Sequence, residues 1–123
     1  MKVNPYLYFN GNCAEAIALY EKAFNVKAEI MPNAENLVSH AQFEIGGDSI
    51  NLCDAEHPVK IGDNMVITIH FNEPEAVAAK AAFDTLKEGG EVIMELEENS
   101  WNTCFGLLAD KFGVKWMMCQ GAK

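Results

Sequence analysis

The same succession of predicted elements occurs twice along this chain, and this repetition restricts its fold more than any other feature. The first succession is a strand, a helix and three strands, predicted at residues 3–10, 13–25, 27–31, 37–45 and 49–54. The second has the same order, predicted at residues 65–72, 74–87, 91–96, 103–110 and 115–120. Phe9-Asn10 also recurs as Phe71-Asn72, 62 residues later. One succession alone cannot bury both faces of its sheet, so the two must pack together or with a second chain.

The length agrees with one domain built from two such repeats. A chain of 123 residues is long enough for one compact domain with a hydrophobic core and leaves little for another. We therefore predict a single domain over residues 1–123, with pseudo-repeats at about 1–56 and 64–123.

Periodicity predicts which side of each element is buried. The strand at 37–45 alternates between an apolar face and a polar face, formed by Ala41, Phe43 and Ile45 and by His40, Gln42 and Glu44. The first helix is predicted to start at Asn12, with Glu15 as its capping-box partner. The second helix is predicted to bury one side, formed by Val77, Ala79, Phe83 and Leu86.

The charge balance excludes one class of partner. The chain carries 18 acidic residues against 9 basic ones, for a net charge of −9, and every basic residue is lysine. Nucleic-acid recognition relies on arginine and on a positive surface, so we do not expect a nucleic-acid partner. The acidic surface favours neutral or cationic ligands.

Three further features point to a protein that works in the cytoplasm. No apolar run approaches the ~18 residues of a membrane helix, and the first residues show no greasy signal segment. The four cysteines, at positions 13, 53, 104 and 119, have spacings that fit no zinc motif. We expect them to be reduced, and we expect no membrane contact.

Two stretches carry a family resemblance that covers nearly the whole chain. PYLYFNGNCAEAIALYEKAF, at residues 5–24, contains the pattern G-N-x-x-E-A-x-x-x-Y-x-x-x-F, and WNTCFGLLADKFGVKWMM, at 101–118, contains G-x-x-x-D-x-F-G-x-x-W. HAQFEIGGDSINLCDA, at 40–55, fits between them. The chain thereby resembles the PhnB-like branch of the vicinal oxygen chelate superfamily, which includes glyoxalases, dioxygenases and bleomycin-binding proteins. The resemblance implies an α+β fold in which two βαβββ modules form a curled mixed-sheet cup with helices on its outer face. It also implies a homodimer.

The resemblance further implies four positions at which metal-dependent relatives hold a divalent ion. They correspond here to Asn51, Val66, Met117 and either Asn4 or Pro5, because the register of the first strand is open by one residue. Divalent ions such as Zn²⁺ or Mn²⁺ prefer imidazole, carboxylate or thiolate ligands. None of these residues supplies one, so we predict no metal and no cofactor.

Alternation then predicts which side chains line the cup. The predicted ligand-binding residues are His40, Gln42, Asn51, Thr68, His70 and Met117, with Trp101 at the mouth. We interpret the protein first as a metal-free, dimeric small-molecule-binding protein for an apolar or cationic compound. The alternative is a lyase, isomerase or transferase of the same superfamily, with a displaced metal site or with His-based chemistry. Its candidate catalytic residues are His40, His70 and Glu44.

Overall fold

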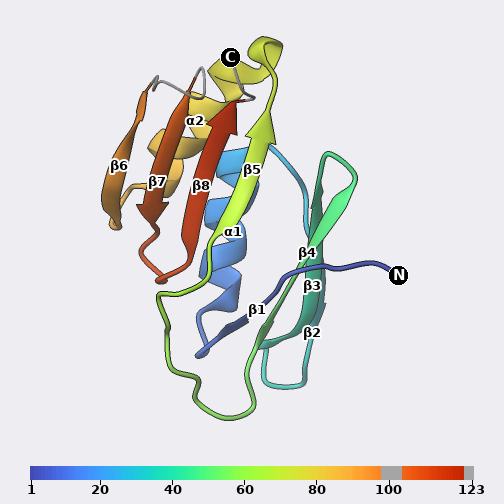
Figure 1. Cartoon of the computed structure of the whole chain (residues 1–123). Coiled ribbons are helices and arrows are strands. Elements are labelled where there is room, and N and C mark those ends of the chain that lie inside the picture. Colours follow the sequence, from blue (N-terminus) through green and yellow to red (C-terminus); the bar gives the residue numbers. More distant parts are fainter. Residues whose placement is uncertain (98–103, 121–123) are drawn as a thin grey trace. The chain divides into compact units, whose positions relative to one another are not determined.

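A computed structural model describes residues 1–97 and 104–120, and the chain divides into two compact units, Met1–Lys60 and Ile61–Lys123. The first unit consists of β1 (Tyr6–Phe9), α1 (Cys13–Phe24), β2 (Glu29–Pro32), β3 (Val38–Ile45) and β4 (Asp48–Asp54). Its strands form one sheet, here sheet A, in the order β1-β4-β3-β2 (Figure 1). β1 runs parallel to β4, and the other pairs are antiparallel.

The second unit repeats this topology. It consists of β5 (Ile67–Phe71), a short 3-10 turn η1 (Glu73–Glu75), α2 (Ala76–Leu86), β6 (Glu91–Glu97), β7 (Phe105–Ala109) and β8 (Lys115–Gln120). Its sheet, here sheet B, has the order β5-β8-β7-β6, again with the first strand parallel to the last (Figure 1). The predicted α+β fold of two βαβββ modules is thereby confirmed.

Helix α1 covers one face of sheet A through an apolar stripe. Ile17 and Tyr20 are buried, and so are Phe43 and Leu52 on the sheet. The Tyr20 ring lies 6.0 Å from the Phe43 ring, and the Phe24 ring stacks on Phe43 at 6.3 Å. The apolar half of the alternating pattern in β3 therefore faces the helix, as predicted.

The start of α1 differs from the prediction. The Asn12 side chain makes no capping hydrogen bond, so the Asn12–Glu15 capping box is wrong. The Cys13 backbone N–H instead donates to Asp54 Oδ1 at 3.0 Å, and the Val38 N–H donates to Asp54 Oδ2 at 2.9 Å. One carboxylate at the end of β4 thus caps the helix and also holds the start of β3.

Helix α2 packs against sheet B with one correction to the predicted stripe. Ala79, Ala82, Phe83 and Leu86 are buried, whereas Val77 is 84% exposed. The buried positions follow the i, i+3, i+4, i+7 spacing of one helix face. Val77 precedes Ala79 by two residues, a separation of ~200° around the helix axis, and therefore points away from the sheet.

Asp110 organises the turn between β7 and β8. Its side chain is buried, with the residue 3% exposed. Asp110 Oδ1 accepts the backbone N–H groups of Phe112 at 2.9 Å and Val114 at 3.1 Å, and Oδ2 accepts Trp116 Nε1–H at 3.0 Å. Gly113 completes the turn with a φ of 88°, which favours glycine. This carboxylate therefore satisfies three donors that folding removes from water.

The glycine four residues before Asp110 has a packing role. A Cβ atom at Gly106 would lie 2.8 Å from Leu96 Cα and 2.9 Å from the Phe83 ring. Close packing thus explains Gly106, the positive φ explains Gly113, and the buried hydrogen bond explains Asp110 and Trp116. These four residues are all but the phenylalanine of the pattern G-x-x-x-D-x-F-G-x-x-W. Phe112 is itself at the limit of burial, 9% exposed.

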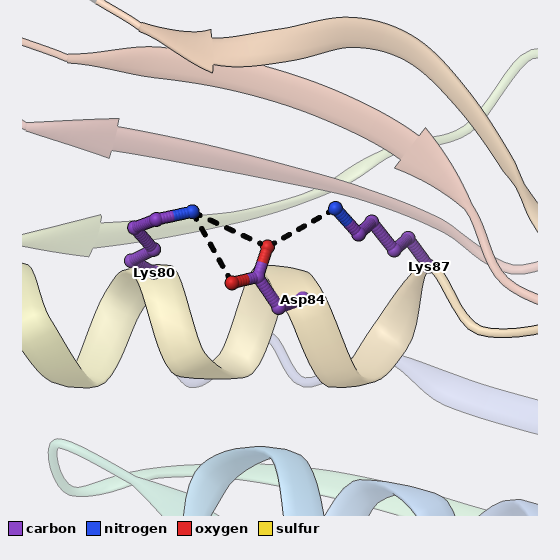
Figure 2. A network of polar contacts seen from close by, with 3 residues as sticks. All are labelled: Lys80, Asp84 and Lys87. Atoms are coloured by element: carbon purple, nitrogen blue, oxygen red, sulfur yellow. Dashed lines mark hydrogen bonds and ion pairs between the residues drawn. The ribbon is translucent and has the colours of Figure 1, made fainter.

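The outer surface of α2 carries a small ionic network. Figure 2 shows Asp84 between Lys80 and Lys87, each with its Nζ 3.2 Å from an Asp84 carboxylate oxygen. Hydrogen bonds from Lys80 and then Lys87 lower the pKa of Asp84. All three side chains are exposed, so water screens this network and it adds little stability. Within residues 1–97 and 104–120, neither helix is long and apolar enough to span a membrane.

We expect Asp110→Ala to lower the free energy of unfolding by about 3 kcal/mol or more, because the N–H groups of Phe112, Val114 and Trp116 lose the carboxylate that accepts them in the turn. The exposed carboxylate Asp84 provides a matched control: Asp84→Ala should stay within about 0.5 kcal/mol of the parent. Urea unfolding followed by circular dichroism measures both. Similar losses for the two variants would contradict this account of Asp110.

Candidate functional site

The face of sheet A opposite α1 carries a set of polar and aromatic side chains. Alternation along the strands places these side chains on one side of the sheet. We define this set as the polar face: Tyr6, Tyr8, His40, Gln42, Asn51 and Cys53. Tyr6 and Tyr8 are 44% and 52% exposed, and His40, Gln42 and Asn51 are half-buried. The two tyrosine rings are thus accessible to a ligand, whereas the amide side chains of Gln42 and Asn51 are partly covered.

The members of the polar face contact one another. His40 Nε2 lies 3.3 Å from Asn51 Oδ1, and because that oxygen only accepts, Nε2 carries the hydrogen in this arrangement. The Tyr6 ring lies 6.0 Å from the His40 ring and 5.1 Å from the Tyr8 ring. Gln42 is the cross-strand partner of Asn51. The result is a connected patch that extends over β1, β4 and β3.

Two titratable groups of the polar face have shifted pKa values. Burial raises the pKa of the Cys53 thiol, and the hydrogen bond with Tyr6 opposes part of that effect. Burial also raises the pKa of Tyr6, and the neighbouring Cys53 adds to the shift. At neutral pH the Tyr6 phenol is therefore uncharged and the Cys53 thiol is protonated. Neither group is prepared to act as a nucleophile or a base.

The corresponding face of sheet B has a different chemistry. We define it as the apolar face: Thr68, His70, Phe105, Leu107, Met117 and Cys119. Thr68 Oγ1 donates to Met117 Sδ at 3.8 Å. His70 is exposed and is the cross-strand partner of Cys119. Apart from Thr68 and His70, these side chains offer no strong hydrogen-bonding group.

The two faces occupy equivalent positions of the repeat. Tyr6 pairs with Asn51 across parallel strands in sheet A, just as Thr68 pairs with Met117 in sheet B. In the antiparallel pairs, Gln42 opposite Asn51 corresponds to Leu107 opposite Met117. The repeat therefore keeps the backbone register and replaces two amides by a leucine and a methionine.

The predicted site residues fall into these two groups. His40, Gln42 and Asn51 lie together on the polar face, and Thr68, His70 and Met117 lie on the apolar face. Trp101, predicted at the mouth of the cup, lies outside the described residues. The candidate base Glu44 is exposed at the end of β3, where its cross-strand partner is Ser49.

Sequence reasoning missed Tyr6 and Tyr8 as site residues. The letters YLYF carried the signal, because alternate aromatics on a four-residue strand must share one face. Their role becomes clear only with the parallel pairing of β1 and β4, which places Tyr6 beside Asn51 and Tyr8 beside Cys53.

The superfamily's metal positions do not fit a divalent ion here. Asn51 Oδ1 is engaged by His40, Val66 has no donor atom and precedes β5, and Met117 offers only a thioether. For the first strand, the alternation that puts Tyr6 on the polar face favours Asn4 over Pro5, and an amide is again a weak ligand. Among residues 1–97 and 104–120, no three His, Cys, Asp or Glu side chains are grouped to hold a metal. The donor set disagrees with the chemistry of Zn²⁺ or Mn²⁺ sites.

A shallow depression of about 380 Å³ lies at one border of sheet A. It is lined by Val26, Lys27, Glu29, Gln42, Phe43 and Glu44. Gln42 therefore belongs both to the polar face and to the wall of this depression. Two of the lining residues are carboxylates and one is a lysine.

The fold and these faces define a protein class. The model of the Glyoxalase/Bleomycin resistance protein/Dioxygenase superfamily matches residues 2–118, and the chain belongs to that superfamily. Among curated proteins, it is 31% identical to Protein YjdN of Escherichia coli strain K12, over 96% of this chain and 94% of that protein.

Two solved structures are similar over the whole chain. Protein PA1353 from Pseudomonas aeruginosa is 28% identical, with a TM-score of 0.85 over 100% of this chain and 99% of that one. The PhnB protein from Bacillus cereus, described as a candidate 3-demethylubiquinone-9 3-methyltransferase, is 25% identical, with a TM-score of 0.80 over 98% and 100%. The expected resemblance to PhnB-like proteins is confirmed.

Met117 and Met118 allow a test of which face each side chain occupies. Met117 is half-buried on the apolar face, whereas Met118 is fully buried towards α2. We expect Met118→Trp to destabilise the protein by about 1–3 kcal/mol or more, because a filled core cannot take the larger ring. Met117→Trp should cost less than about 1 kcal/mol, because its face is not close-packed. Equal costs in thermal or urea unfolding would disprove the assignment of Met117 to an open face.

Proposed function

We propose that this chain is a metal-free small-molecule-binding protein of its superfamily, which takes an apolar or cationic organic compound. The observation that carries the proposal is the polar face, where exposed aromatic rings stand beside connected amide and imidazole groups. Small-molecule sites are commonly built from apolar surface with a few convergent polar groups. The proposed ligand-binding residues are those predicted from the sequence, with the two tyrosines added: Tyr6, Tyr8, His40, Gln42 and Asn51 on the polar face, Thr68, His70 and Met117 on the apolar face, and Trp101, which lies outside the described residues.

Binding is favoured over catalysis by what surrounds the candidate bases. The described polar partner of His40 is the amide of Asn51, not a carboxylate, so the arrangement lacks the acidic partner that raises the basicity of a catalytic histidine. Glu44 is exposed beside Ser49. These contacts suit a side chain that recognises a ligand better than one that transfers a proton.

The methyltransferase description of the Bacillus cereus PhnB protein is not part of this proposal. A nucleotide-like methyl donor is usually held by a glycine-rich loop between a strand and a helix. Here β1 leads into α1 through Asn10-Gly11-Asn12, with one glycine. The sequence offers no other support for that activity.

We expect a ligand screen to identify binders in a library of apolar and cationic organic compounds. A compound at a hundred times its Kd should stabilise the protein by about 2.7 kcal/mol, which a thermal shift detects. Asn51→Leu removes an amide while keeping a similar volume and should weaken binding about tenfold, since a lost hydrogen bond in a sheltered site has that effect. Thr68→Val removes a hydroxyl at similar volume and tests in the same way whether the apolar face contributes to binding. The proposed function would be refuted if the screen found no binder among either the apolar or the cationic compounds.

We expect the purified protein to contain less than about 0.1 divalent ion per chain, because the metal positions lack suitable donors. Elemental analysis after purification without chelators measures this content. About one Zn, Mn, Ni or Fe per chain would refute the metal-free proposal and favour the enzyme alternative.

We further propose that the protein is a cytoplasmic homodimer. Cys13, Cys53 and Cys119 are free thiols, which supports a reducing compartment. The edge strand β6 exposes Ile93 and Met94, at 44% and 49%, and exposed apolar edges favour association. Sedimentation equilibrium at tens of micromolar should therefore give about twice the chain mass of 13.6 kDa. A mass equal to that of one chain would contradict the dimer.

A further inference from the structure

The two tyrosines of the polar face form an aromatic platform. Their ring centroids are 5.1 Å apart with an interplanar angle of 60°, and the His40 ring lies 6.0 Å from Tyr6 at a similar tilt. About half of each tyrosine remains exposed. Aromatic side chains on a sheet are normally covered, and rings left open in this way offer electron-rich faces to a ligand.

The charges on sheet A all have one sign. The four strands, each described in full, contain no lysine and carry the carboxylates of Glu29, Glu44, Asp48 and Asp54. Asp54 is engaged by backbone N–H groups, whereas Glu29 and Glu44 are exposed. With a net charge of −9 for the chain, the potential over this face is negative, and it attracts cations.

One row of side chains connects the platform to a carboxylate. Tyr6 is registered with Asn51, Asn51 with Gln42, and Gln42 with Glu29, across the four strands of the sheet. At ~4.8 Å between strands, this row spans about 14 Å. Its far end is the depression of about 380 Å³ lined by Gln42, Glu29 and Glu44. The row therefore offers, in order, an aromatic ring, two amides and a negative charge.

We infer, resting on the proposed small-molecule binding, that the ligand is an aromatic organic cation held over Tyr6 and Tyr8. The rings bind the cation through their faces, the amides of Asn51 and Gln42 accept or donate hydrogen bonds, and Glu29 and Glu44 supply the field. Lys27 lies at the depression, where it disfavours a second positive charge at that end. A monocation with one flat ring system fits these groups better than a polyamine.

The test compares two probes of the same shape. N-methylquinolinium carries a positive charge, and 1-methylnaphthalene is its neutral counterpart. We expect the cation to bind about three- to tenfold more tightly, as measured by calorimetry at low salt, because only the cation gains from the ring faces and the acidic field. Tyr8→Leu should remove most of that preference, whereas Tyr8→Phe should keep it, because phenylalanine retains the ring.

A charge-matched pair of variants separates local from global electrostatics. Glu44→Gln and Asp84→Asn each remove one negative charge, but Lys80 and Lys87 already pair with Asp84 and offset its charge locally. Glu44→Gln should weaken cation binding about twofold, and Asp84→Asn should leave it unchanged.

The outcomes distinguish this inference from the function on which it rests. Equal affinities for the two probes, or a preference that survives Tyr8→Leu, would overturn the cation assignment and leave small-molecule binding in place. Binding of neither probe would also overturn the assignment, whereas the proposed function fails only if the wider screen finds no binder. A cation preference that depends on the ring at position 8 supports the inference.

Discussion

The structure depends on one constraint: among the described residues, each unit has one α-helix for a four-stranded sheet. A helix can cover only one face of a sheet, so the strands divide into residues that face the helix and residues that do not. Leu52, Phe43, Trp116 and Met118 take the first role and form the cores of their units. The opposite faces are then free of the packing requirement, and this freedom allows them to carry functional chemistry.

Two carboxylates, the half-buried Asp54 and the buried Asp110, hold this arrangement at the strand ends. Asp54 caps α1 and holds β3, and Asp110 satisfies two backbone N–H groups and the Trp116 indole. The family pattern near the C-terminus includes Asp110, Gly113 and Trp116, and each of these has a structural reason. The residues of this family pattern are therefore residues that stabilise the fold.

The repeat also shows how one scaffold produces two surfaces. The register of the parallel pair is the same in both sheets, yet Tyr6 and Asn51 stand where the second unit has Thr68 and Met117. At the positions that the resemblance assigns to the metal, Asn51 and Met117 are poor ligands for a divalent ion.

The sequence by itself determined the order of the elements, the α+β class and the inward or outward direction of most strand residues, because a period of two in β3 leaves no other choice. Once the family resemblance had identified the metal positions, residue chemistry alone indicated that they lack suitable ligands. Contacts distant in sequence were decided by the tertiary structure alone. The cap of α1 comes from Asp54, 41 residues after Cys13, and no local pattern contains that information. Tyr6 joins the polar face only when parallel pairing places it beside Asn51 and 6.0 Å from the His40 ring, because strand pairing, unlike alternation, is not a property of any single segment.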